Sequence, residues 1–203
     1  MIRNPYSASA VKFSFWFAEC KTTLSLLNEG KSFQDIARLS QENNLYLATS
    51  QARGKLICST CAKRLKALNP DQALMTLFFS SDVATQKLIN LIAIMASDTL
   101  FFDLVYTVIK DKLIIGNFEL TDSDFRIFFR NVQSQDGRAA KWTEATVKKL
   151  TTTYKSYLAD AGLSDRARSV RRLYRPILDP ALENWLLSHD MRPVVSALTG
   201  ETR

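Results

Sequence analysis

The sequence predicts an all-α protein, and two observations carry that prediction. Apolar residues recur at spacings of three and four along most of the chain, whereas the strict alternation typical of half-buried strands is rare. Helix-capping residues such as Ser32 and Thr143 stand directly before several of these apolar runs. The chain has 203 residues, 46% of them hydrophobic, and is therefore long enough to bury a sizeable core. We expect a multi-helix bundle.

Capping and turn residues delimit the helices of the first half. A first helix is expected from about residue 8 to residue 27, with one buried stripe formed by Val11, Phe15, Ala18, Thr22 and Leu26. It ends at the Asn28-Glu29-Gly30 exit signal, and Ser32 with Asp35 then forms a capping-box variant for a short second helix. Further helices are expected over residues 49–68, 71–79, 82–96 and 99–113.

One apolar run is long enough to span a bilayer. It covers residues 88–109 without a Lys or Arg, but it contains Asp98 and Asp103. An Asp near the membrane centre costs about 2.5 to 3.5 kcal/mol, and Ser97-Asp98-Thr99 is typical of a helix N-cap. We therefore expect two buried helices in place of a membrane span.

The second half of the chain is expected to contain a domain boundary. Residues 114–120 (IIGNFEL) are the one place where extended chain is expected, and Thr121 then begins a helix that runs to about Val132. The polar, Gly-containing stretch 133–138 (QSQDGR) is the best linker candidate. We accordingly predict a helical bundle domain over residues 1–136 and a basic helical module over residues 137–203, packed on it.

The predicted basic module has a helix with two unlike faces. From a cap at Thr143 to Ala161-Gly162, Leu150, Tyr154 and Leu158 fall on one side, and lysines fall on the other. An arginine-rich connector follows, and Pro180 is expected to open another helix. The order of helix, basic connector and helix predicts a helix-and-wing arrangement.

Positive charge is concentrated in this module. Residues 138–175 hold ten basic and three acidic residues, and the rest of the chain holds 17 of each, so this stretch carries the whole net charge of +7. Such a local field favours an anionic partner. Arg supplies forked donors suited to phosphate oxygens and Lys supplies point charge, so nucleic acid is the leading partner, against the alternative of a merely solvated basic loop. The candidate binding residues are Lys141, Lys148, Lys149, Lys155, Arg166, Arg168, Arg171, Arg172 and Arg175.

A second basic cluster lies on the third predicted helix. Its members are Arg53, Lys55, Lys63, Arg64 and Lys66. A solvated helix face explains them better than an auxiliary phosphate-contacting surface, which stays the alternative.

Catalysis and metal binding find little support in the sequence. There is one His, at position 189, and no phosphate-binding or nucleophile motif, and the nearby carboxylates Asp122 and Asp124 are explained by helix capping. Cys58 and Cys61 form a Cys-x-x-Cys motif, but a zinc site lacks a second ligand pair, so two buried helical cysteines are expected. No enzyme activity, cofactor or metal is expected, and the odd cysteine count without a secretory signal predicts a cytoplasmic protein.

Three long stretches of the chain follow the pattern of a known family. They are EGKSFQDIARLSQENNLYLATSQARGKLICSTCAKRLKAL, LFFDLVYTVIKDKLIIGNFELTDSDFRIFF and WTEATVKKLTTTYKSYLADAGL with its basic continuation. In this order they resemble the BrxA family, accessory proteins of bacterial BREX (bacteriophage exclusion) systems. The resemblance implies a non-catalytic helical protein, similar in its helical part to the antitermination factor NusB, that binds double-stranded DNA beside a methyltransferase and large ATPase-type partners. The family has also carried an inner-membrane label, which Asp98 and Asp103 argue against.

The leading hypothesis is therefore a double-stranded DNA-binding accessory protein of phage defence with little sequence specificity. RNA binding is the nearest alternative, but it requires exposed stacking aromatics. A protein adaptor, whose basic surface docks an acidic surface of another BREX protein, is the other alternative. A membrane role ranks last.

Overall fold

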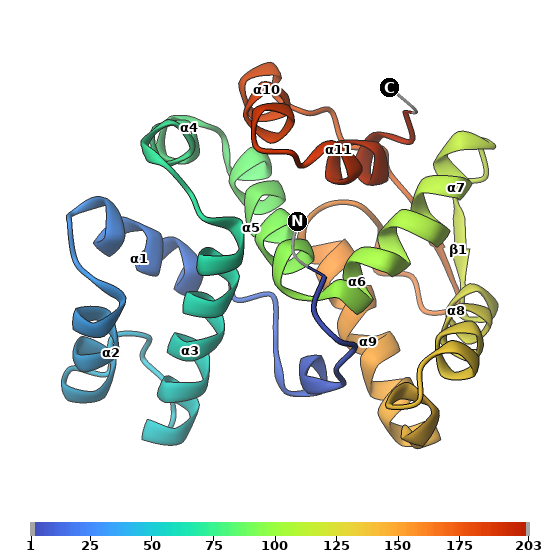
Figure 1. Cartoon of the computed structure of the whole chain (residues 1–203), viewed down its shortest axis with the longest axis horizontal. Coiled ribbons are helices and arrows are strands. Elements are labelled where there is room, and N and C mark those ends of the chain that lie inside the picture. The colour runs from blue at the N-terminus through green and yellow to red at the C-terminus, as the bar shows by residue number, and fades with distance from the viewer. Residues whose placement is uncertain (1–2, 202–203) are drawn as a thin grey trace.

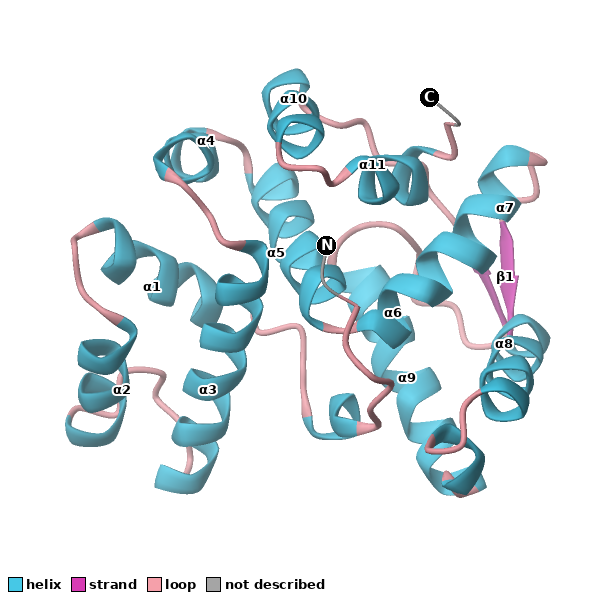
Figure 2. Ribbon diagram, viewed as in Figure 1, coloured by secondary structure: helices cyan, strands magenta, loops and turns pink. Residues whose placement is uncertain are grey.

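The computed structural model describes residues 3–201, and most of them lie in helices arranged around a central helix, α5 (Figures 1 and 2). The all-α prediction is confirmed. The helices before α5 are α1 (Phe17–Asn28), α2 (Phe33–Glu42), α3 (Gln51–Leu68) and α4 (Gln72–Ser80). The central helix and those after it are α5 (Val83–Ser97), α6 (Thr99–Leu104), α7 (Lys110–Ile114), α8 (Asp122–Gln135), α9 (Glu144–Asp160), α10 (Pro180–Ser188) and α11 (Arg192–Thr199).

Helix α5 is buried along most of its length. Every residue from Leu88 to Ser97 is buried, because α3, α4 and α6 pack against this helix. The largely apolar composition of residues 88–97 is therefore what a helical segment without a solvent-exposed face requires. Among the residues that the structure describes, no single helix is long and apolar enough to cross a membrane.

The long apolar run divides where the sequence predicted. The Asp98 side chain accepts a hydrogen bond from the backbone N–H of Phe101 and thereby caps α6. At this break the helical path bends by 110° between α5 and the continuation of α6. The continuation passes from α6 through a π-helical segment, Val105–Ile109, into α7.

Two predicted helix starts have the complete capping box. Ser32 and Asp35 exchange hydrogen bonds at the start of α2, and Thr121 and Asp124 do the same at the start of α8. Each box satisfies two backbone donors that would otherwise lack a partner. Asp124 of α8 therefore serves in capping, as the sequence indicated. Asp122 does not belong to the box, and its carboxylate pairs with Lys155 instead, so the capping explanation was wrong for that residue.

The N-terminal segment departs from the predicted long helix. Residues Ser9–Lys12 form a 3-10 turn, the chain then extends, and α1 begins only at Phe17. Trp16 has a φ of 48°, which an α-helix does not contain. The carbonyls of Ser14 and Phe15 accept hydrogen bonds from Arg64 of α3 in place of helical N–H groups. The predicted start at residue 8, and with it the stripe from Val11 to Leu26, was therefore wrong.

A small antiparallel sheet joins two distant segments. Strand β1 (Glu119–Thr121) pairs with β2 (Val170–Arg172), with Leu120 opposite Arg171 (the strands are magenta in Figure 2). Extended chain was predicted near β1, but the arginine connector was not expected to form its partner. The helix-and-wing arrangement and the likeness to NusB stay predictions.

Core residues from both sides of the predicted domain boundary pack together. Tyr154, Tyr157 and Leu186 belong to the same hydrophobic cluster as Phe101 and Leu104 of the first part. The division at residues 136 and 137 stays a prediction, and the two parts share one core.

Candidate nucleic-acid interface

Helix α9 forms the base of the candidate site, and its inner face lies where the sequence placed it. Thr143 caps the helix by accepting from the N–H of Thr146, and Leu150, Tyr154 and Leu158 are each 0% exposed. Because one side of α9 is fixed in the core, the orientation of its lysines is fixed as well.

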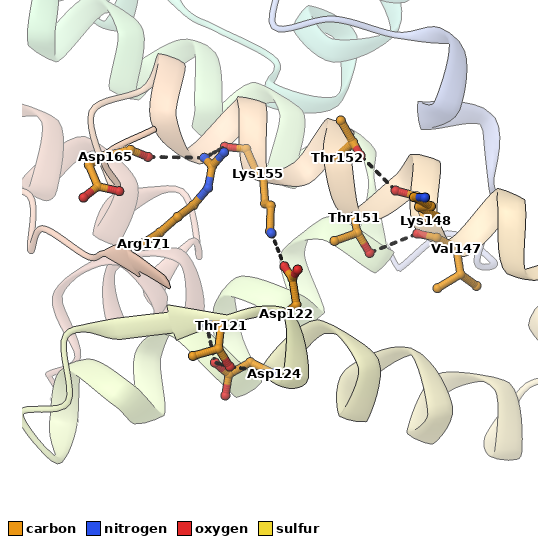
Figure 3. Close-up of polar contacts among 10 residues, drawn as sticks. All are labelled: Thr121, Asp122, Asp124, Val147, Lys148, Thr151, Thr152, Lys155, Asp165 and Arg171. Atoms are coloured by element: carbon orange, nitrogen blue, oxygen red, sulfur yellow. Dashed lines mark hydrogen bonds and ion pairs between the residues drawn. The ribbon is translucent and has the colours of Figure 1, made fainter. Parts of the chain in front are cut away.

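The lysines of α9 have two different environments. Lys148 and Lys149 are exposed near the start of the helix, whereas Lys155, two turns after Lys148, is only 9% exposed. The Lys155 ammonium is paired with the Asp122 carboxylate at the start of α8, as Figure 3 shows. Lys155 therefore neutralises a charge of the protein itself, and its assignment to a solvent-facing cationic surface was wrong.

Arg171 of β2 also turns toward the protein. Its guanidinium donates to the carbonyl of Lys155 at 2.8 Å and to that of Asp165 at 3.2 Å (Figure 3). Burial lowers the pKa of Arg171, and its buried Nε atom has no partner within the described part of the chain. This side chain joins the connector to α9 and is placed to hold the structure in position.

Two further arginines of the connector are exposed, but each has one partner within the protein. Arg166 is exposed but forms an ion pair with Asp160 of α9 at 2.5 Å. Arg175, also exposed, donates to the carbonyl of Leu113 in α7 at 2.8 Å. Exposed ion pairs are weak, at about 0 to 1 kcal/mol, so Arg166 can exchange its carboxylate for a phosphate at low cost.

The remaining candidates are exposed cations. Within residues 3–201 they make no ion pair or side-chain hydrogen bond with another residue of the chain: Lys141, Lys148, Lys149, Arg168 and Arg172. Arg172 stands opposite Glu119 in the β1–β2 register, so one carboxylate lies near this group. These five side chains form the part of the predicted site that is available to an external anion.

The second basic cluster is smaller in the structure than in the sequence. Arg64 is 2% exposed and donates to the carbonyls of Phe15 and Ser14 at 2.9 and 2.8 Å, so its inclusion in a surface patch was wrong. The guanidinium of Arg53 lies 4.9 Å from the ring centre of Trp16. Lys55, Lys63 and Lys66 remain exposed on α3.

Sequence reasoning missed two exposed arginines beside this site. Arg126 and Arg130 lie one turn apart on α8, the helix whose first turn is joined to α9 by the Asp122–Lys155 pair. The charge count began at residue 138 and so excluded them. Their spacing of four residues could have predicted this pair, because it places both arginines on one face of the helix.

The cysteine motif is buried as predicted. Cys58 is 7% exposed and Cys61 is 0% exposed, both on α3. Within the described residues, no group of three or more His, Cys, Asp or Glu side chains is placed to hold a metal ion.

Fold and site together define a helical protein with several exposed cations in its C-terminal third. The family model for BrxA matches residues 4–190. A BREX protein BrxA from Bacillus cereus (strain H3081.97) is 34% identical over 180 residues, which cover 88% of this chain and 89% of the relative. The chain belongs to the BrxA family.

A solved structure shares the fold. The crystal structure of an uncharacterized protein from Magnetospirillum magneticum matches 98% of this chain and 100% of its own, with a TM-score of 0.79 at 18% identity. At this identity the likeness concerns the fold alone.

Proposed function

We propose that this protein binds double-stranded DNA without catalysis, as an accessory protein of a BREX phage-defence system. Membership in the BrxA family supports the BREX role, because the curated relative carries that name. The observation that carries DNA binding is the set of exposed cations on α9 and its connector, led by Lys148, Lys149, Arg168 and Arg172.

The chemistry of these groups favours phosphate over bases. Lysines supply point charge at the start of α9, where backbone N–H groups also favour anions, and the arginines supply forked donors. No base-reading motif accompanies them, so the proposal is a positioner of DNA with little sequence preference. If about five phosphates are neutralised, log K falls against log salt with a slope of about −4 to −5.

RNA binding has less support. Sequence-specific recognition of RNA stacks bases on exposed aromatic side chains. Tyr154 and Tyr157 of α9 are 0% and 1% exposed and cannot stack on a base, whereas Tyr174 of the connector is exposed. An adaptor that docks an acidic protein surface uses the same cations and is separated from DNA binding only by experiment.

The absence of catalysis is part of the proposal, and the surroundings of the single histidine support it. The His189 ring stacks on Trp185 with ring centres 4.1 Å apart, and its Nε2 atom lies 3.4 Å from the Asp71 carboxylate. These contacts join α10 to the start of α4 and explain the residue as structural.

The test is a fluorescence-anisotropy titration with duplexes of unrelated sequence across a salt series. The charge reversals K148E/K149E and R168E/R172E are each expected to weaken binding at least about tenfold, since each removes two phosphate contacts and adds repulsion. The control, K12E/K31E, makes the same change in net charge at two exposed lysines in the first part of the chain. Its affinity is expected to stay within about twofold of the unmodified protein.

Three outcomes contradict the proposal. Equal loss in the control and in the site variants means that net charge alone drives binding. Affinity that does not change with salt excludes phosphate contacts. A failure to bind duplex, together with capture of another BREX protein that R168E/R172E abolishes, favours the adaptor.

A further inference from the structure

Cys20 of α1 and Cys61 of α3 face each other in the interior. Their Sγ atoms are 3.0 Å apart, and the side chains are 4% and 0% exposed. With Trp16 and Ile57 they form a small hydrophobic cluster that is separate from the main core. The two helices lie side by side in Figure 1, so the pair connects two neighbouring helices through residues that are 41 positions apart in sequence.

The other cysteine of the Cys-x-x-Cys motif has a different environment. Cys58 lines a groove of about 280 Å³ between α2 and α3, together with Phe33, Ala37 and Ala62. The motif is thus divided, since Cys61 is hydrogen-bonded to Cys20 and Cys58 is turned toward the groove. Cys58 is therefore a matched control on the same helix.

We propose that Cys20 and Cys61 are an oxidative modification site, at which a peroxide converts the two thiols into an intramolecular disulfide between α1 and α3. The Cys20 sulfur attacks one oxygen of hydrogen peroxide, giving a sulfenic acid and one water. The Cys61 sulfur then attacks the sulfenic sulfur, the S–S bond forms and a second water leaves. Two thiols lose two protons and two electrons, and one peroxide is reduced to two waters.

The geometry needs little change for this bond. A disulfide requires an S–S distance of about 2.05 Å, so the sulfurs must approach by only about 1 Å. A pocket of about 10 Å³ adjoins Cys20 between α1, α3 and α5, which is about the space of one water molecule. Hydrogen peroxide is larger than water, so the packing around Cys20 must open locally before peroxide reaches the sulfur.

The surrounding charge favours the attacking thiolate. The hydrogen bond with Cys61 lowers the pKa of the Cys20 thiol, and the nearby Arg64 guanidinium acts in the same direction against the effect of burial. Arg64 is fixed in place by its bonds to the carbonyls of Phe15 and Ser14. A thiolate beside a fixed cation is the reactive form of cysteine.

The experiment uses the full chain treated with hydrogen peroxide, followed by counting of free thiols and mapping of disulfide-linked peptides under non-reducing conditions. The unmodified protein and C58S are both expected to give a Cys20–Cys61 linked peptide that disappears on reduction. C20S and C61S are expected to give no such peptide. Because the bond closes a loop of 41 residues, the oxidised protein is expected to unfold at a temperature higher by roughly 5 to 15 °C.

Two results overturn the inference. The first is a Cys58–Cys61 linkage in the oxidised protein together with no linkage in C58S. The second is full retention of thiols by the folded protein when its unfolded form is oxidised under the same peroxide treatment. Neither readout uses DNA, so this test is independent of the proposed function.

Discussion

At the scale of single residues, burial decides what each cation does. Arg171 and Arg172 are neighbours on β2, but one donates to two backbone carbonyls and the other is exposed to solvent. Alternation along a strand sends successive side chains to opposite faces, which is why adjacent arginines have different roles.

This difference predicts opposite phenotypes for two alanine variants. Arg171→Ala is expected to lower the free energy of unfolding by about 1 to 3 kcal/mol, since the carbonyls of Lys155 and Asp165 lose a donor. Arg172→Ala is expected to change stability by less than about 0.5 kcal/mol while weakening duplex binding. Urea unfolding and anisotropy titration of both variants check this. Equal stability loss in the two would show that Arg172 is structural as well.

At the scale of elements, Asp71 links two helices. Its carboxylate caps α4 by accepting from the N–H of Leu74 at 2.9 Å and also accepts from the indole Nε1 of Trp185 in α10 at 2.8 Å. Asp71 and Trp185 are 114 residues apart in sequence, so this hydrogen bond holds α10 against the start of α4 across a long stretch of chain.

Replacing Asp71 by Ala is expected to cost about 1 to 2 kcal/mol in the free energy of unfolding, because both the cap and the indole bond lose their acceptor. Denaturant unfolding followed by tryptophan fluorescence measures this change in the free energy of unfolding. Asp71→Asn keeps an acceptor and is expected to lose less. A loss equal in both variants would mean that the carboxylate charge, and not the hydrogen bond, matters.

The same residue predicts a pH dependence. The hydrogen bond from Leu74, aided by that from Trp185, lowers the pKa of Asp71 in the folded protein. Because the folded pKa lies below the unfolded value, the stabilisation is present above the ordinary Asp pKa of about 4 and is lost as pH falls through the folded value. The stability difference between the unmodified protein and Asp71→Asn is therefore expected to shrink below about pH 4, which thermal unfolding across a pH series will measure. A difference that stays constant over that range contradicts this assignment.

At the scale of the whole molecule, the C-terminal third supplies part of the core. Tyr154 stacks against Phe129 and lies 5.0 Å from Phe101 between ring centres, and Val194, Ala197 and Leu198 of α11 are 0% exposed. The exposed cations of the proposed site therefore belong to a segment whose buried residues complete the fold.

A fragment of residues 1–136 is consequently expected not to fold by itself. Without α9 to α11, Phe101 of α6 loses its contacts with Tyr154 and Tyr157, and the segment Val105–Ile109 loses α11 as its neighbour, which costs several kcal/mol. Near-ultraviolet circular dichroism and thermal scans of the fragment check this. A cooperative transition in the fragment would instead establish the predicted boundary at residues 136 and 137 as a true domain limit.

The sequence by itself determined the helical class, the capping boxes of α2 and α8, the division at Asp98, the inner face of α9 and the location of the surplus charge. These are local properties, set by the periodicity and capping chemistry of neighbouring residues. Only the tertiary structure decided that Lys155 pairs with Asp122 and that Arg64 binds an N-terminal carbonyl, across 33 and 49 residues of sequence. It likewise decided that β1 pairs with the arginine connector. Whether a cation meets solvent or a partner depends on which distant segment packs over it, and periodicity along one helix contains no information about that segment.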